Sequence, residues 1–115
     1  SVKSIGEDAF YCCDNLTTVV IGNGVKIIGA YTFVECDSLI SIVMGESVTV
    51  IEESAFSRCN NLTKVYYQGT ASEWGNISIG DNNYMLTDAT RYYYDESETA
   101  DSWWHYDGNG QIVHG

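Results

Sequence analysis

The sequence predicts an α/β repeat solenoid. In this fold a right-handed coil of 23-residue rungs carries short parallel strands on its concave face and short helical turns on its convex face, and a β-rich C-terminal cap closes it. Three observations lead to this prediction: apolar residues recur every 23 positions as far as Tyr67, the recurrence then stops, and 115 residues suffice for one domain. A 23-residue unit cannot bury its own apolar side chains, so neighbouring units must stack.

Columns of identical residues define the repeat. They are Val2/Val25/Val48, Ile5/Ile28/Ile51, Phe10/Phe33/Phe56, Cys13/Cys36/Cys59 and Leu16/Leu39/Leu62. Together with small and β-branched columns between them they give the unit V-x-x-I-G-x-x-A-F-x-x-C-x-x-L-x-x-V-x-I. A period of about 20–29 residues with an L-x-x-V-x-I core is typical of leucine-rich repeats. We therefore assign residues 1–67 to three leucine-rich repeats, at about 2–24, 25–47 and 48–70.

Each repeat divides into three parts. The β-branched and aromatic-rich segments predict one short parallel strand per rung, at residues 16–21, 39–44 and 62–67. Alanine or threonine, phenylalanine and cysteine at short offsets predict a single helical or 3₁₀ turn that packs its phenylalanine inward, at residues 7–13, 30–36 and 53–59. Glycines mark the turn after the strand, and a second, minor strand is expected at residues 25–28 and 48–51.

These repeats resemble one particular family. The run I-G-x-x-A-F-x-x-C-x-x-L is similar to the BspA-like, treponemal-type leucine-rich repeats of bacterial surface proteins, and it is seen best in Ile5, Gly6, Ala9, Phe10, Cys13 and Leu16. The resemblance covers about residues 2–67. It departs from the family pattern after the strand, where glycine-containing turns replace the usual proline, because the chain has no proline.

The C-terminal part has a different composition. Residues 68–115 carry eight acids and one base, against eight acids and four bases in residues 1–67. We expect residues 68–94 to form a capping segment, because the last rung of a solenoid needs a cover. Residues 95–115 are predicted to form an acidic loop followed by an aromatic hairpin with a tight glycine turn. Because no comparable cap precedes the first repeat, we expect the chain to be the C-terminal piece of a longer array.

The charge excludes whole classes of partner. Five Lys and Arg against sixteen Asp and Glu leave a net charge of −11, which repels phosphate backbones and anionic membrane surfaces. Nucleic acid is therefore not an expected partner. The longest apolar runs are a few residues long, whereas a membrane-spanning helix needs about 20, so no membrane insertion is expected.

The cysteine column Cys13, Cys36 and Cys59 predicts buried thiols without a metal, because zinc ligands usually come as C-x₂₋₄-C pairs and each rung offers a single thiol here. A disulfide between neighbouring rungs is the alternative, since rungs about 4.8 Å apart permit it sterically. Cys12 lies outside the column and is expected on the surface.

No residue pattern points to catalysis, a metal or a cofactor. The two imidazoles, His105 and His114, have no Cys or Ser in a recognisable catalytic motif near them. The acidic clusters at residues 52–53 and 95–101 lack the oxygen-ligand spacing of a calcium loop, which favours a solvated acidic surface. We therefore expect a protein that is not an enzyme.

The concave face holds the predicted partner-binding residues. With Val19 and Ile21 pointing inward, the alternate residues of each strand must point outward. This gives two outward columns, Thr18/Ser41/Lys64 and Val20/Val43/Tyr66. Either they form an ordinary same-face ladder in which neighbours shield one another, or the second column is an exposed apolar ridge for a partner.

Two functions remain open from the sequence. The family resemblance implies a protein-interaction or adhesion module of a bacterial cell-surface or secreted protein, with a host extracellular protein as a possible partner. The alternative is a glycan- or cell-wall-binding module that uses the aromatic hairpin with Trp103, Trp104 and Tyr106, which is similar to the units of choline-binding wall anchors. Burial of both tryptophans against the last rung would favour a cap instead. We also expect a dimer through the uncapped first rung.

Overall fold

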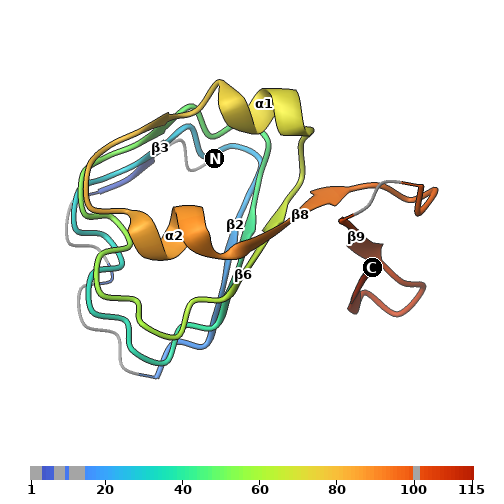
Figure 1. Ribbon diagram of the computed structural model, residues 1–115, viewed down its shortest axis with the longest axis horizontal. Helices are drawn as coiled ribbons and strands as arrows, with labels where there is room; N and C mark the ends of the chain where they lie inside the picture. The colour runs from blue at the N-terminus through green and yellow to red at the C-terminus, as the bar shows by residue number, and fades with distance from the viewer. Residues whose placement is uncertain (1–3, 7–9, 11–14, 100–101) are drawn as a thin grey trace.

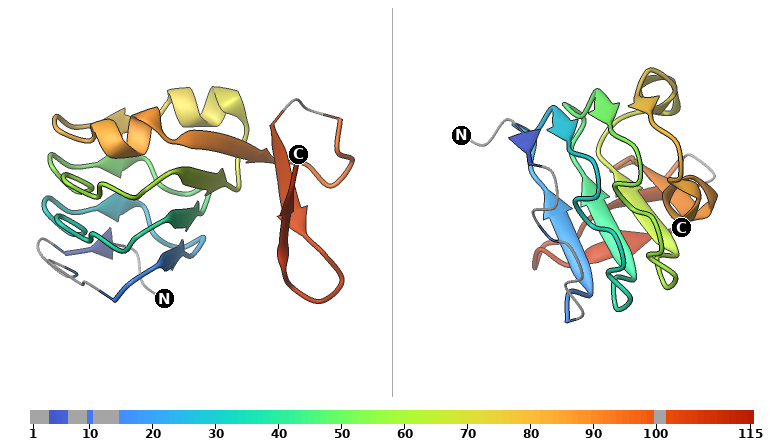
Figure 2. Two further views of the ribbon diagram at one scale, coloured as in Figure 1. Left: turned by 60° about the horizontal axis from the view of Figure 1, so that its bottom comes forward. Right: turned by 90° about the vertical axis from the view of Figure 1, so that its left-hand side faces the viewer.

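The computed structural model describes residues 4–6, 10, 15–99 and 102–115 (Figure 1). The chain coils through stacked levels, and a hairpin at the C-terminus lies beside the stack (Figure 2). The elements are β1 (Ser4–Ile5), β2 (Thr18–Ile21), β3 (Ile27–Ile28), β4 (Ser41–Met44), β5 (Val50–Ile51), β6 (Lys64–Tyr67), α1 (Ala71–Gly75), β7 (Ser78–Ile79), α2 (Tyr84–Asp88), β8 (Thr90–Tyr94), β9 (Trp103–Tyr106) and β10 (Ile112–His114).

Two sheets run through the levels, which confirms a leucine-rich-repeat type of fold. The minor strands form a parallel sheet in the order β1-β3-β5-β7, and the major strands form a sheet in the order β10-β9-β8-β6-β4-β2. Thr18 pairs with Ser41 and Ser41 with Lys64, so residues 23 positions apart lie side by side. The major strands begin two residues later than predicted. The buried Leu39 and Leu62 lie in the bend that enters each strand and contribute to the core there.

The prediction of a helical or 3₁₀ turn on the convex side is wrong for residues 30–36 and 53–59. Left-handed φ angles of 58–62° at Tyr31, Glu35, Ser54 and Arg58 interrupt any helix. Turn bonds to the residue three positions earlier, as from the N–H of Cys36 to the carbonyl of Phe33, alternate with bonds to the next level, and the N–H of Phe33 donates to the carbonyl of Ala55 at 2.7 Å. The turns therefore extend the ladder between levels. Apart from Phe10, the first predicted turn lies outside the described residues.

The constant spacing of the repeat places identical side chains in contact; Phe33 and Phe56 are fully buried, whereas Phe10 in the first level is 40% exposed. The rings of Phe10 and Phe33 stack with centroids 5.2 Å apart, and those of Phe33 and Phe56 stack at 5.1 Å. Beside this stack the thiol of Cys59 donates to the carbonyl of Phe33 at 2.9 Å, and Cys36 makes the equivalent bond to Phe10 at 3.2 Å. Both cysteines are buried, as predicted. Cys12 and Cys13 lie outside the described residues.

Residues 68–94 extend the stack by a further level, so the structural pattern continues beyond the sequence repeat. β7 pairs with β5 and β8 pairs with β6, both in parallel. Two short helices replace the irregular turns, and a capping box between Thr70 and Glu73 starts α1. In this level Asn83 replaces a backbone acceptor with a side-chain one. Its Oδ1 accepts from the N–H of Phe56 at 2.9 Å, where the preceding levels use a backbone carbonyl.

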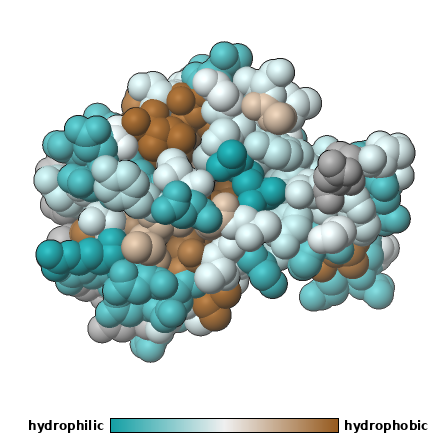
Figure 3. All heavy atoms as spheres, viewed as in Figure 1, coloured by the Kyte–Doolittle hydropathy of each residue, from teal (hydrophilic) through white to brown (hydrophobic). Residues whose placement is uncertain are grey.

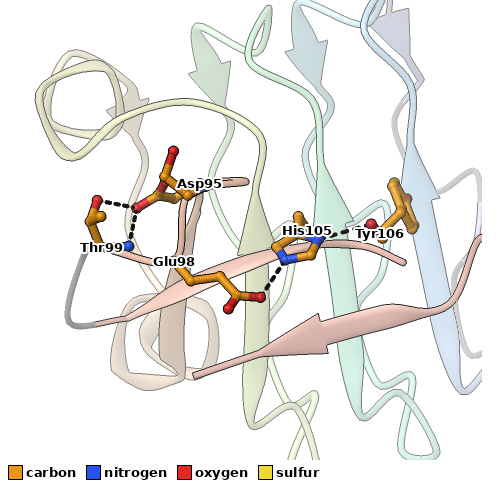
Figure 4. Close-up of polar contacts among 6 residues, drawn as sticks. Asp95, Glu98, Thr99, His105 and Tyr106 are labelled. Carbon is orange, nitrogen blue, oxygen red and sulfur yellow. Dashed lines mark hydrogen bonds and ion pairs between the residues drawn. The ribbon is translucent and has the colours of Figure 1, made fainter. Parts of the chain in front are cut away.

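The C-terminal hairpin curls the major sheet over its own concave face. β9 pairs in parallel with β8 and antiparallel with β10, so the sheet continues past the last level and turns back (Figure 2). In the view of Figure 4, β9 crosses the strands of the stack. The hairpin therefore covers the side of the stack and does not close its end, where the sequence analysis expected it.

Candidate functional site

The C-terminal hairpin buries part of the predicted partner-binding surface on the concave face. Val43 is fully buried and Tyr66 is 5% exposed, so the prediction that both are exposed on the concave face is wrong. Their side chains do point away from the main core, as the strand alternation requires, but they form a second apolar cluster with Trp104. The cause is a contact between distant segments, which the strand pattern alone does not reveal.

Trp104 fastens the hairpin to the stack. Its indole is fully buried, and its Nε1–H donates to the carbonyl of Tyr67 at 2.7 Å. Its ring lies 5.7 Å from the ring of Tyr66, and the rings of Tyr94 and Tyr106 meet it edge-on at 5.3 and 5.2 Å. Trp104 is thus an internal support, and the two adjacent tryptophans do not form one exposed aromatic surface.

Part of the concave face remains uncovered. Val20, the first member of the apolar column, is 66% exposed although it lies in register with the buried Val43. Beside it the hydroxyls of Thr18 and Ser41 share a hydrogen bond of 3.2 Å, and Lys64 is half-buried in the same column. The structure therefore leaves a mixed polar and apolar strip at the first levels.

The outer face of the hairpin adds a second surface on this side of the molecule. Trp103 and His105 alternate with the buried Trp104, and their rings stack with centroids 5.4 Å apart. His105 Nε2 lies 2.8 Å from the carboxylate of Glu98, and its Nδ1 lies 2.8 Å from the carbonyl of Tyr106 (Figure 4). The carbonyl of Tyr106 and the Glu98 carboxylate raise the pKa of His105, because both favour the protonated ring.

The acidic loop before β9 is ordered by its first carboxylate. Asp95 accepts from the backbone N–H of Ser97 at 2.9 Å and from the backbone N–H and hydroxyl of Thr99, each at 3.0 Å (Figure 4). Such bonds from a carboxylate to the following residues form a compact turn. The loop thereby holds Glu98 beside His105.

A groove opens where the loops after the major strands meet the ends of β8 and β9. We call it the tyrosine groove; its volume is about 380 Å³, and it is lined by Asn23, Glu46, Gln68, Tyr94 and Tyr106. One polar residue comes from each of three consecutive levels, and the two tyrosines come from the C-terminal part. Sequence analysis singled out Tyr106 but missed the other four. The position of each polar side chain within two residues of the end of a repeat strand is the sequence signal for Asn23, Glu46 and Gln68.

The described residues include neither a cluster of metal-ligand side chains nor a helix that could cross a membrane. They contain no group of three or more His, Cys, Asp or Glu side chains placed to hold a metal ion. Burial raises the pKa of the Cys59 thiol to about 12, which keeps it protonated and a poor nucleophile or ligand. In the same part of the chain, no helix combines the length and apolar character needed to cross a membrane.

The end of the stack offers scattered apolar side chains. Figure 3 looks onto the level with α1 and α2 and shows apolar areas divided by polar ones. Tyr84 on α2 is 68% exposed there. Isolated exposed apolar residues are normal on folded proteins, so this face supports a binding surface less well than the concave face does.

Comparisons with known proteins agree with the fold. Residues 1–87 match the family described as "BspA type Leucine rich repeat region (6 copies)". The crystal structure of a leucine-rich cell surface protein from Faecalibacterium prausnitzii A2-165 matches with a TM-score of 0.61 and 28% sequence identity over 97% of this chain. This chain corresponds to 29% of the length of that protein chain. No curated protein sequence matched.

Proposed function

Because the chain belongs to the BspA-type leucine-rich-repeat family, we propose that it is a protein-binding and adhesion module of a bacterial cell-surface or secreted protein. Leucine-rich repeats are typical of protein-interaction modules, and stacked repeats commonly bind through the face that their strands line. The similar protein from Faecalibacterium is a leucine-rich cell surface protein, which supports the same location for this chain. In this proposal the repeats form a right-handed coil of 23-residue rungs, and the module binds its partner without catalysing a reaction.

The exposure of Val20 carries the proposal. The hairpin buries the next two members of its column, whereas Val20 remains 66% exposed beside the Thr18 and Ser41 hydroxyls. An uncovered apolar side chain with hydrogen-bonding neighbours provides both burial and orientation for a partner. The partner-binding surface in this proposal comprises the predicted residues that remain accessible, Thr18, Val20, Ser41 and Lys64, together with Trp103 and His105 of the hairpin.

The negative charge of the chain favours a partner with a basic surface. A net charge of −11 attracts a protein that presents a basic surface and accelerates the encounter at low ionic strength. Glu98 and the acidic loop stand beside the outer face of the hairpin. We therefore propose an extracellular partner, such as a host protein, with a basic patch around an apolar contact.

The test compares two equally exposed residues. Extracellular proteins captured on the immobilised chain are identified, and the affinity of each is measured for the wild type, Val20→Ser and Tyr84→Ser. Tyr84 is 68% exposed but lies on α2, away from the proposed surface, which makes it the matched control. We expect Val20→Ser alone to weaken binding, by about 1–2 kcal/mol, and added salt to weaken it further.

Equal effects of the two substitutions, or a partner that binds independently of salt, would contradict this surface. Self-association is tested separately. Because β2 is an edge strand of the major sheet, we expect the isolated chain to dimerise with rising concentration in sedimentation experiments. A chain that stays monomeric at high concentration would exclude that contact.

A further inference from the structure

The tyrosine groove has a rigid aromatic side. Tyr94 and Tyr106 are each 38% exposed, so part of each ring faces solvent. Both rings are held edge-on at 82° against the fully buried Trp104, whose indole is itself bonded to the backbone of β6. A ligand that stacks on these phenols does not have to order them first, which lowers the entropic cost of binding.

The opposite side of the groove is polar. Asn23 and Glu46 are each the second residue after the major strand of their level, and Gln68 is the first residue after β6, so three neighbouring levels each contribute one side chain. The turns that carry them stack closely, and a Cβ at Gly45 would lie 2.8 Å from the carbonyl oxygen of Gly22. Together these three side chains supply amide donors and amide and carboxylate acceptors.

The charge of the groove excludes anionic ligands. Glu46 is its charged side chain, none of the described residues that line it is Lys or Arg, and the whole chain carries a charge of −11. A phosphate, sulfate or acidic sugar would be repelled. A basic peptide would pair with Glu46, so the experiment below includes one as a competing probe. A neutral ligand that both donates and accepts hydrogen bonds uses the whole lining.

We infer that the tyrosine groove binds a neutral oligosaccharide. The apolar C–H face of a sugar ring stacks on Tyr94 and Tyr106, and its hydroxyls bond to Asn23, Glu46 and Gln68. The volume of about 380 Å³ lies within the range of about 300–1,000 Å³ for small-molecule sites, and the polar side of the groove offers several hydrogen-bonding partners for the hydroxyls of a sugar. Burial and the neighbouring Glu96 raise the pKa of Tyr94, so its phenol stays neutral and its ring remains an uncharged stacking surface.

This site goes beyond the proposed protein binding and uses different residues. It also differs from the glycan surface predicted from the sequence, which places Trp103 and Trp104 in contact with the ligand. In the structure Trp104 is the buried support, and the exposed platforms are Tyr106, from the predicted set, and Tyr94.

The experiment uses the intact chain on an array of neutral glycans built from hexose, N-acetylhexosamine and deoxyhexose units, with sialylated glycans alongside. The affinity for the neutral glycan retained most strongly is then measured by NMR titration, with tetralysine as the basic-peptide probe. We expect Glu46→Gln, Gln68→Ala and Tyr106→Leu each to weaken glycan binding about tenfold or more, which corresponds to about 1.4 kcal/mol. The conservative Tyr106→Phe should retain stacking and lose less.

Three controls make the result decisive. Tyr84→Ala should leave glycan affinity unchanged, and so should Val20→Ser, which tests the protein-binding surface separately. Thermal unfolding of each groove variant shows whether it has kept its fold, and Glu46→Gln changes an exposed side chain without altering its size. The inference is overturned if no neutral glycan is retained, if the folded groove variants bind as well as the wild type, or if tetralysine alone binds and Glu46→Gln abolishes it.

Discussion

Replacing Trp104 with alanine should lower the free energy of unfolding by about 3–5 kcal/mol. A fully buried tryptophan removes about 150–250 Å² from water, and at about 25 cal/mol per Å² this burial contributes about 4–6 kcal/mol as an upper estimate. Loss of the hydrogen bond to the Tyr67 carbonyl accounts for about 1 kcal/mol of the predicted loss. A chain of 115 residues has a total stability of about 6–17 kcal/mol, so the variant should remain folded but be clearly weakened.

Urea unfolding followed by circular dichroism measures this loss. Trp103→Ala is the matched control, because the neighbouring indole is half-buried on the outer face and stacks on His105. We expect it to cost about 1 kcal/mol or less. Trp104→Phe should fall between the two, since it keeps an apolar ring but leaves the Tyr67 carbonyl without the indole donor. Equal losses for Trp103→Ala and Trp104→Ala would refute the role of Trp104 as the fastening of the hairpin.

Three further predictions concern individual side chains. The thiol of Cys59 should resist alkylation in the native protein at neutral pH and react after unfolding, as mapped by mass spectrometry of its peptide, because burial raises its pKa to about 12; native labelling at this position would contradict its burial. Asn83→Ala should cost about 1–3 kcal/mol in urea unfolding, because the buried N–H of Phe56 loses its acceptor, and an unchanged midpoint would show that water replaces the amide. The raised pKa of His105 means that its protonated ring stabilises the fold: this contribution is complete below about pH 6, below the unfolded pKa, and is lost as pH rises through the higher folded pKa. His105→Gln and Glu98→Gln should both flatten the dependence of hairpin stability on pH between about 6 and 8, measured by thermal unfolding, and a dependence that survives in both variants would assign it to other groups.

The recurrence of residues in the sequence was sufficient to predict the stack. Identical side chains at intervals of 23 residues, such as Phe33 and Phe56, can be in contact only if the chain repeats the same path, and the structure places them 5.1 Å apart. The same recurrence correctly predicted the burial of Cys36 and Cys59 and the pairing of the major strands. These contacts join neighbouring levels, so a local pattern contains all the information they need.

The form of the convex turns was less accessible to sequence reasoning. The spacing of Ala, Phe and Cys suits one helical turn, but the backbone of Phe33 bonds to the next level, and left-handed residues such as Tyr31 accommodate this. The further level formed by residues 68–94 was also hidden, because its turns are built from helices and its register departs from 23 residues. Asn83 shows the reason: a side chain there performs the task of a backbone carbonyl, and no repeat pattern reveals such a substitution.

The sequence by itself determined the repeat, the in-and-out alternation of its strands and the acidic charge of the chain. Only the tertiary structure decided which outward-facing residues are accessible. Trp104 bonds to the backbone of Tyr67, 37 positions earlier, and covers Val43 and Tyr66 while leaving Val20 exposed. The same contact holds Tyr94 and Tyr106 at the rim of the groove. Such a contact leaves neither a periodic nor a local pattern in the sequence, because it depends on how far the sheet curls before the hairpin meets the strands.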